Sequence, residues 1–125
     1  MKYLCLAYEE EATLNALSER EWHALRDETI AYVRMLRERG HLIVTEALQA
    51  VHTATTVRVR GGKHSTTDGP FAETKETLGG IFLIEARDRD EALRLAAEWP
   101  SARIGSIEVR PIEESLPTDR RYART

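Results

Sequence analysis

Hydrophobic and polar side chains alternate with two different periods along the chain. Residues 3–8 and 81–84 are short runs that are apolar at consecutive positions, which is typical of strands covered on both faces. Residues 55–60 instead alternate Thr or Arg with Val at a spacing of two, which indicates a half-exposed strand. The chain is therefore expected to contain both central and peripheral strands.

Two other segments show the three- and four-residue spacing of amphipathic helices. The first begins at a capping box formed by Ser18 and Glu21, and it is expected to end at Gly40, which can adopt the left-handed C-terminal conformation. The second begins at Asp88 and is stopped by Pro100. Each helix follows one of the doubly apolar strands.

A hairpin is predicted between these two halves of the chain. Gly61-Gly62 suits a tight turn, so residues 63–67 should fold back antiparallel on residues 55–60. The segment Asp68-Gly69-Pro70-Phe71 then ends the pairing, because proline has no amide hydrogen to donate.

The order of elements defines the fold class. The chain also has a brief extended piece at residues 42–44 and a last strand at residues 104–112. The predicted fold class is therefore α+β, with a ferredoxin-like βαββαβ sheet and an inserted hairpin. Two helices cover only one face of such a sheet, and an uncovered apolar face would promote aggregation. We therefore expect a homodimer whose sheets face each other across residues 3–8, 81–84 and 107–109.

Composition sets the remaining limits. The 42% of apolar residues is enough for one core, so we assign one domain to residues 1–115 and a flexible tail to residues 116–125. A net charge of −3 lacks the basic excess that nucleic-acid binding requires. The lone Cys5 cannot form an internal disulfide and is expected to be buried, and the N-terminal residues resemble neither a signal peptide nor a membrane span. A cytoplasmic location without membrane contact is expected.

One segment resembles a known family. The sequence Thr-Asp-Gly-Pro-Phe-Ala-Glu-Thr-Lys-Glu at residues 67–76 is followed by Gly79-Gly80 and later by Glu-Val-Arg-Pro at residues 108–111. Together these motifs resemble the signature of the DGPF proteins, a branch of the YCII-related family, over residues 3–112. The resemblance implies a dimeric α/β barrel. It also implies two kinds of role. A few YCII-related relatives are enzymes that act on small organic molecules. Some DGPF proteins are encoded beside, or fused to, extracytoplasmic-function sigma factors, which points to a regulatory or accessory role.

The catalytic pair of those YCII-related enzymes does not carry over to this chain. In them, a histidine on the first helix is paired with an aspartate in a cleft between that helix and the sheet. Counting back from Gly40 places the corresponding position near Thr29, which is not histidine. His23 falls about a turn and a half too early.

Asp68 is the best candidate for chemistry. A carboxylate on a rigid Gly-Pro turn can act as a base or hydrogen-bond acceptor at the mouth of a cleft, and the alternative is that it caps its own turn. His64, four residues earlier, is either a catalytic base beside Asp68 or an exposed strand residue.

Further residues are candidates for ligand binding. Tyr8 and Trp22 either line a pocket beside the first helix or belong to the core. Glu73 and Lys75 either bind a polar ligand or form a solvated or intersubunit salt-bridging segment. The four histidines lack metal-site spacing, and no phosphate-binding loop, dinucleotide fingerprint or nucleophile elbow occurs, so we expect neither a metal nor a cofactor.

Two functions remain open at this point. The first, which the incomplete catalytic set favours, is a module that binds a small molecule or serves as a regulatory or accessory protein, for instance for a sigma factor. The second is a cofactor-free enzyme that acts on a small polar metabolite through Asp68 with Glu73 or His64 across the subunit boundary.

Overall fold

The structure is a computed structural model that describes residues 1–115, so the predicted tail at residues 116–125 lies outside the described residues. The elements follow the predicted order, with a short α-helix after the first strand and two 3-10 helices in addition. They are β1 (Lys2–Glu9), α1 (Glu11–Asn15), α2 (Glu19–Glu38), β2 (Leu42–Ala47), the 3-10 helix η1 (Val51–Thr53), β3 (Thr55–Arg60), β4 (Lys63–Asp68), β5 (Thr77–Glu85), α3 (Arg89–Ala97), the 3-10 helix η2 (Pro100–Arg103) and β6 (Gly105–Pro111).

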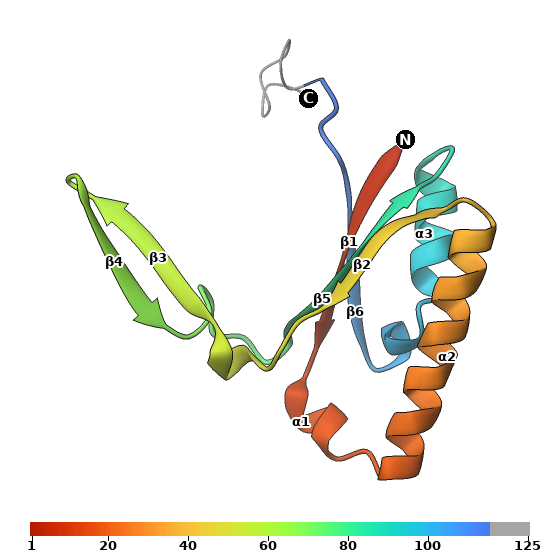
Figure 1. Cartoon of the computed structure of the whole chain (residues 1–125), viewed down its shortest axis with the longest axis horizontal. Coiled ribbons are helices and arrows are strands. Elements are labelled where there is room, and N and C mark those ends of the chain that lie inside the picture. Colours follow the sequence, from red (N-terminus) through yellow and green to blue (C-terminus); the bar gives the residue numbers. More distant parts are fainter. Residues whose placement is uncertain (116–125) are drawn as a thin grey trace.

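The main sheet has four strands in the order β2-β5-β1-β6, and every neighbouring pair is antiparallel. Both long helices, α2 and α3, lie on the same side of this sheet (Figure 1). The predicted ferredoxin-like α+β sheet with an inserted hairpin is thus confirmed. A single chain forms an open sheet, so closure into a dimeric barrel stays a prediction that requires a second copy.

Local sequence signals explain both ends of α2. At its start, the Ser18 hydroxyl accepts a hydrogen bond from the Glu21 amide at 3.1 Å, and the Glu21 carboxylate accepts one from the Ser18 amide at 2.8 Å. At its end, Gly40 has a φ of 78° and the His41 amide donates to the Leu36 carbonyl at 2.8 Å. This is a Schellman-type ending, which glycine permits. The predicted boundaries of this helix are confirmed.

The core lies between the helices and one face of the main sheet. Its centre is the contact between Phe82 and Trp99, whose rings stack with centroids 4.0 Å apart. Tyr32 of α2 meets Trp99 edge-on and donates its hydroxyl hydrogen to the Leu95 carbonyl at 2.6 Å. The predicted burial of Cys5 is confirmed, and burial raises the pKa of its thiol to about 12. The buried cluster is completed by Tyr3, Leu36, Ile84, Ala86, Ala92 and Ala96.

The other face of the main sheet has no helix on it (Figure 1). Alternate residues of β1 and β5 point to this face and are half-buried. We call this surface the open face, and its apolar residues are Leu4, Leu6, Tyr8, Ile81 and Leu83. The predicted share of residues 107–109 in this surface is wrong, because Ile107 and Val109 pack against the helix-side core and Glu108 lies in register with Leu6.

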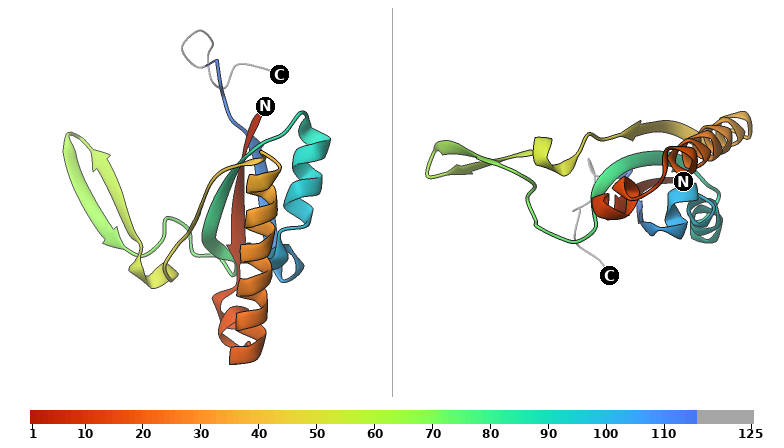
Figure 2. Two further views of the ribbon diagram at one scale, coloured as in Figure 1. Left: turned by 45° about the vertical axis from the view of Figure 1, so that its right-hand side comes forward. Right: turned by 90° about the horizontal axis from the view of Figure 1, so that it is seen from below.

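The inserted hairpin forms a separate two-stranded sheet of β3 and β4. Its turn is made by Gly61 and Gly62, with φ values of 56° and 79°, the backbone that a two-residue hairpin turn requires. The hairpin projects from the body of the domain, on the side of the open face (Figures 1 and 2). We call residues 55–68 the arm.

The Asp-Gly-Pro-Phe turn lies where the arm returns to the body. Gly69 has a φ of 111°, and its amide donates to the Ala54 carbonyl at 2.7 Å. The Phe71 ring lies 5.7 Å from the guanidinium carbon of Arg58. Within residues 1–115, the Asp68 carboxylate has no hydrogen-bond or ion-pair partner, so the interpretation that it caps its own turn is wrong. The backbone, not the aspartate side chain, fixes the turn.

Substitutions in this turn should therefore differ in their effect on stability. Gly69→Val places a β-branched residue at a positive φ and should lower the free energy of unfolding by about 1–3 kcal/mol. Pro70→Ala should lower the free energy of unfolding by about 0.4–1 kcal/mol, because alanine leaves the unfolded chain with more conformational entropy than proline does. Asp68→Asn should change stability by less than about 0.5 kcal/mol. Urea unfolding measures all three, and a loss for Asp68→Asn as large as that for Gly69→Val would show that the charge is structural.

Candidate functional site

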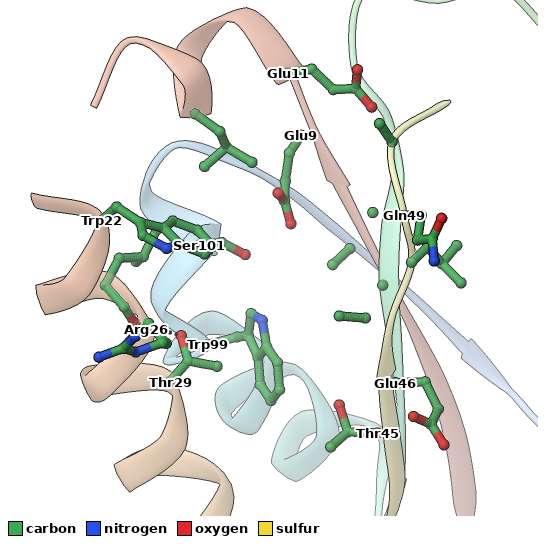
Figure 3. Close-up of a pocket in the computed structure, with 18 of the residues that line it drawn as sticks. Glu9, Glu11, Trp22, Arg26, Thr29, Thr45, Glu46, Gln49, Trp99 and Ser101 are labelled. Carbon is green, nitrogen blue, oxygen red and sulfur yellow. Dashed lines mark hydrogen bonds between the residues drawn. The ribbon is translucent and has the colours of Figure 1, made fainter. Parts of the chain in front are cut away.

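A pocket with a volume of about 960 Å³ lies between α2 and the helix-side face of the main sheet. Side chains from β1, β2, β5, α1, α2 and η2 surround it (Figure 3). Its volume is at the upper end of the range of small-molecule sites, about 300–1,000 Å³. The pocket is therefore large enough to accept a ring-sized organic molecule.

Two tryptophans provide the aromatic walls of the pocket. Trp99 follows α3 and is 8% exposed, so it is a rigid inner wall held by its stack on Phe82. Trp22 comes from α2 and is 46% exposed, and it lies nearer to α1 (Figure 3). Flat apolar rings at the inner and outer ends of a pocket favour a planar or apolar ligand body.

Glu9, the last residue of β1, extends its carboxylate into the pocket (Figure 3). A register shift between β1 and β5 leaves space for the Glu9 side chain. Ala7 pairs with Gly80 but Tyr8 pairs with Leu78, so Gly79 is a bulge residue. A Cβ atom added at Gly79 would lie 3.3 Å from the Glu9 carboxyl carbon. Among residues 1–115 this carboxylate has no hydrogen-bond or ion-pair partner, and burial raises its pKa.

Ser101 contributes a second polar group without a partner. This residue of η2 is 7% exposed and lines the pocket, and its hydroxyl has no hydrogen-bond partner among the described residues. It is held there because Pro100 ends the helical path of α3 and starts the turn of η2. Buried hydroxyl groups are nearly always hydrogen-bonded. Glu9 and Ser101 therefore both present unused hydrogen-bonding capacity to the same cavity.

The threonine hydroxyls in the pocket are already engaged. Thr29 donates to the Leu25 carbonyl at 2.8 Å, and Thr45 donates to the Ile81 carbonyl at 2.9 Å. Their oxygen lone pairs remain as acceptors. Thr29, near the position that the family resemblance assigns to a histidine, also lines the pocket. None of the described residues that line the pocket is a histidine.

Charges at the edge of the pocket are mostly negative. Glu19 and Glu46 line it, and Glu11 accepts a hydrogen bond from the Val51 amide at 2.7 Å, which joins α1 to η1. The cation on the lining, Arg26, is turned to Asp27 at 3.2 Å. The cavity therefore attracts cationic or hydrogen-bond-donating groups.

The predicted site residues are dispersed in a single chain. Trp22 lines the pocket, whereas Tyr8 lies on the open face. His64 pairs with Val59 in the arm, and Asp68 lies at the base of the arm. His64 and Asp68 are four positions apart on an extended strand, a distance of about 13 Å, so the two side chains do not meet. Their catalytic role remains a prediction.

Glu73 and Lys75 lie on the exposed loop between β4 and β5. The Lys75 ammonium is 3.9 Å from the Glu10 carboxylate and its side chain is 81% exposed, which makes this a weak surface ion pair. Neither residue lines the pocket. Ligand binding by these residues also remains a prediction.

Sequence reasoning missed Glu9 and Ser101. A signal for Glu9 is present, because the buried residues of β1 are Tyr3, Cys5 and Ala7, and the next position on the same face is Glu9. A carboxylate that continues a buried stripe is a candidate for a site. We find no comparable signal for Ser101.

Residues 1–115 contain no group of three or more His, Cys, Asp or Glu side chains arranged to hold a metal ion. No helix in the described part of the chain is long and apolar enough to span a membrane.

The fold and the pocket together define a small α+β domain with a ligand-sized cavity between its first long helix and its sheet. The chain belongs to the YCII-related family, whose domain model matches residues 1–115. It is 38% identical over 114 residues to the uncharacterized protein R00369 of Rhizobium meliloti (strain 1021), and the match covers 90% of this chain and 92% of that protein.

A solved structure with the same fold is the 5-chloro-2-hydroxyhydroquinone dehydrochlorinase TftG from Burkholderia phenoliruptrix AC1100, in complex with 2,5-dihydroxybenzoquinone. The TM-score is 0.55 at 15% sequence identity, and the match covers 95% of this chain and 100% of TftG. At this identity the similarity shows the shared fold alone.

The raised pKa of Glu9 predicts a pH-dependent stability. Between the ordinary value of 4.5 and the raised folded value, the folded protein keeps a proton that the unfolded chain has released, so stability falls as pH rises through this window. Glu9→Gln removes this effect and should melt at a higher temperature than the wild type at neutral pH.

The difference should vanish below the ordinary pKa of glutamate, where both states are protonated. Glu73→Gln is the matched control, because it removes the same charge from an exposed loop. Thermal unfolding followed by circular dichroism across this pH range measures the effect. Equal melting temperatures for Glu9→Gln and the wild type at neutral pH would contradict it.

Proposed function

We propose that this YCII-related protein binds a compact organic molecule that carries a hydrogen-bond donor, in the pocket between α2 and the main sheet. The observation that carries the proposal is that Glu9 and Ser101 present polar groups without partners to one aromatic-lined cavity. Desolvating a carboxylate costs free energy unless it is paired or hydrogen-bonded. A ligand that donates to Glu9 offsets that cost.

The geometry suggests how such a ligand is held. A ring packed on Trp99, or reaching Trp22, directs a hydroxyl or ammonium group toward Glu9, while Ser101 donates to a carbonyl or hydroxyl oxygen. A hydrogen bond to a charged group contributes about 1.5–3 kcal/mol. The polar pair thus provides orientation, and the tryptophans provide apolar contact area.

The related fold supports a ligand of this size. TftG is described in complex with 2,5-dihydroxybenzoquinone, a ring that bears hydroxyl and carbonyl oxygens. Its fold can therefore surround a six-membered ring. This argument concerns the fold only, since function depends on the individual side chains of a site.

An enzyme is the second candidate function. A carboxyl group whose pKa is raised by burial holds a proton more readily than an exposed one, and Glu9 is placed to exchange a proton with a ligand hydroxyl. TftG, a dehydrochlorinase, is consistent with catalysis on this fold. Asp68 acting with Glu73 or His64 across a subunit boundary is a separate prediction for the same class.

A regulatory role, with a sigma factor as partner, is retained from the family resemblance alone. A domain that binds a small molecule provides the sensing step that such a regulator needs. A sigma-factor gene beside the gene for this chain would favour regulation, whereas a catabolic operon would favour catalysis. A cytoplasmic location and self-association are part of this proposal.

Binding measurements distinguish the pocket from the Asp-Gly-Pro-Phe turn. We expect a thermal-shift screen of hydroxylated aromatic compounds and amines to yield ligands whose affinity falls roughly ten- to a hundredfold in Glu9→Gln. Ser101→Ala should weaken binding in the same direction, because it removes the second polar contact. Asp68→Asn and Glu73→Gln should bind as the wild type does, since neither residue lines the pocket.

Calorimetric titration of the best ligand into the four variants gives the result. A ligand that loses affinity in Asp68→Asn but not in Glu9→Gln would place the site at the turn instead. Loss of turnover in Glu9→Gln with unchanged affinity would favour the enzyme over the binding module.

A further inference from the structure

The pocket between α2 and the main sheet carries most of the net charge of the chain. Its charged lining residues are Glu9, Glu11, Glu19, Glu46 and Arg26. Four negative charges and one positive charge leave −3 at the pocket, which equals the formal charge of the whole chain. Glu9 extends into the cavity, and the other glutamates lie at its edge. The cavity is therefore a negative site on a chain that is otherwise balanced in charge.

The cation on the lining does not offset the charge of Glu9. The Arg26 guanidinium lies 3.2 Å from the Asp27 carboxylate and is directed away from Glu9 (Figure 3). Among residues 1–115 the Glu9 carboxylate forms no ion pair, and burial raises its pKa. A carboxylate that is withdrawn from water is stable as an anion only when a cation or several donors balance it. The missing counter-charge must come from outside the described chain.

Ser101 places a second unused polar group beside Glu9. Its side chain is 7% exposed, its hydroxyl has no partner among the described residues, and it points toward the cavity (Figure 3). The two residues flank Gly105. A Cβ atom at Gly105 would lie 3.4 Å from the Glu9 Cγ atom and 3.4 Å from the Ser101 carbonyl oxygen. One polar group of a ligand can therefore lie between Glu9 and Ser101.

Most of the unused hydrogen-bonding capacity in the pocket is that of acceptors. An ionised Glu9 can only accept, and the hydroxyl hydrogens of Thr29 and Thr45 are already donated to backbone carbonyls. The Ser101 hydroxyl and the Trp99 indole can donate, but both groups are neutral and balance no charge. An ammonium group offers three N–H donors and a positive charge, whereas a ligand hydroxyl offers one donor and no charge. The ammonium group therefore fits this set of acceptors better.

The aromatic walls favour an organic cation. Both tryptophans of the chain, Trp22 and Trp99, line this cavity. The faces of indole rings attract cations and also provide apolar contact area for a hydrocarbon body. We propose that the ligand of this pocket is a compact organic ammonium compound, whose N–H groups bind Glu9 and Ser101 while its hydrocarbon body packs on the tryptophans. This inference rests on the proposed function and narrows its ligand from hydrogen-bond donors in general to cationic amines.

Matched pairs of an amine and an alcohol test the proposal. Benzylamine and benzyl alcohol share one ring and nearly one size, as do cyclohexylmethylamine and cyclohexylmethanol, and at neutral pH only the amines are cations. Because both tryptophans line the pocket, a change in intrinsic fluorescence reports binding there. Each amine should bind the wild type at least about tenfold more tightly than its alcohol, since a hydrogen bond between two charged groups is the stronger one.

Two substitutions that each remove one negative charge locate the interaction. Glu9→Gln keeps the shape of the side chain but removes its charge, so the preference for each amine over its alcohol should fall to less than about threefold. Glu38→Gln is the matched control. Glu38 is the exposed last residue of α2 and does not line the pocket, so this variant should keep the preference of the wild type.

The outcomes separate this inference from the proposed function. Alcohols that bind as tightly as the amines, or a preference for amines that persists in Glu9→Gln, would overturn the ammonium inference. Neutral ligands from the wider screen that depend on Glu9, with no binding of either amine at millimolar concentration, would overturn it as well and leave the proposed function in place. Failure of the screen and of all four compounds would overturn both.

Discussion

The core and the pocket both depend on the packing of the Trp99 ring. This ring stacks on Phe82 of the sheet at a centroid distance of 4.0 Å and meets Tyr32 of α2 at 6.0 Å, so it links the sheet to both helices. Several residues that line the pocket are small, namely Ala7 and Gly80 on the sheet and Thr29 on α2. A core needs large side chains to close the space between two layers. Small residues on the sheet leave part of the space between the sheet and α2 unfilled, and the pocket occupies that space.

The same part of the sheet is shaped by glycines. Gly79 is the bulge residue that leaves room for the Glu9 carboxylate, and a Cβ at Gly105 would lie 2.3 Å from the Tyr8 carbonyl oxygen, closer than any real side chain approaches. Gly105 therefore cannot carry a side chain, and a side chain at Gly79 would crowd the Glu9 carboxylate. The two glycines hold the end of β1 between its two neighbours, and Glu9 is placed at the pocket as a result.

Local signals in the sequence predicted most of the fold, because capping and turn chemistry act over a few residues. The capping box at Ser18, the helix end at Gly40 and the turn at Gly61-Gly62 are formed as expected. The early start of β5 at Thr77 and the five-residue helix α1 were not predicted, since a bulge and a short helix depend on tertiary contacts. Of the pocket, Trp22 alone was predicted. The position of Ser101 depends on how Trp99 packs, and no local sequence motif specifies that packing.

The arm separates two sets of candidate chemistry. The Asp-Gly-Pro-Phe turn and His64 belong to a hairpin that leaves the body, whereas Glu9 and Ser101 belong to a cavity beneath α2. The turn has a structural role that needs no ligand. Gly69 adopts the positive φ that the backbone requires after β4, and its amide donates a hydrogen bond to the Ala54 carbonyl. A motif that is conspicuous in the sequence can therefore direct a chain without forming a site. The residues that line the pocket are chemically ordinary ones, and their unused hydrogen-bonding capacity arises from the packing that surrounds them.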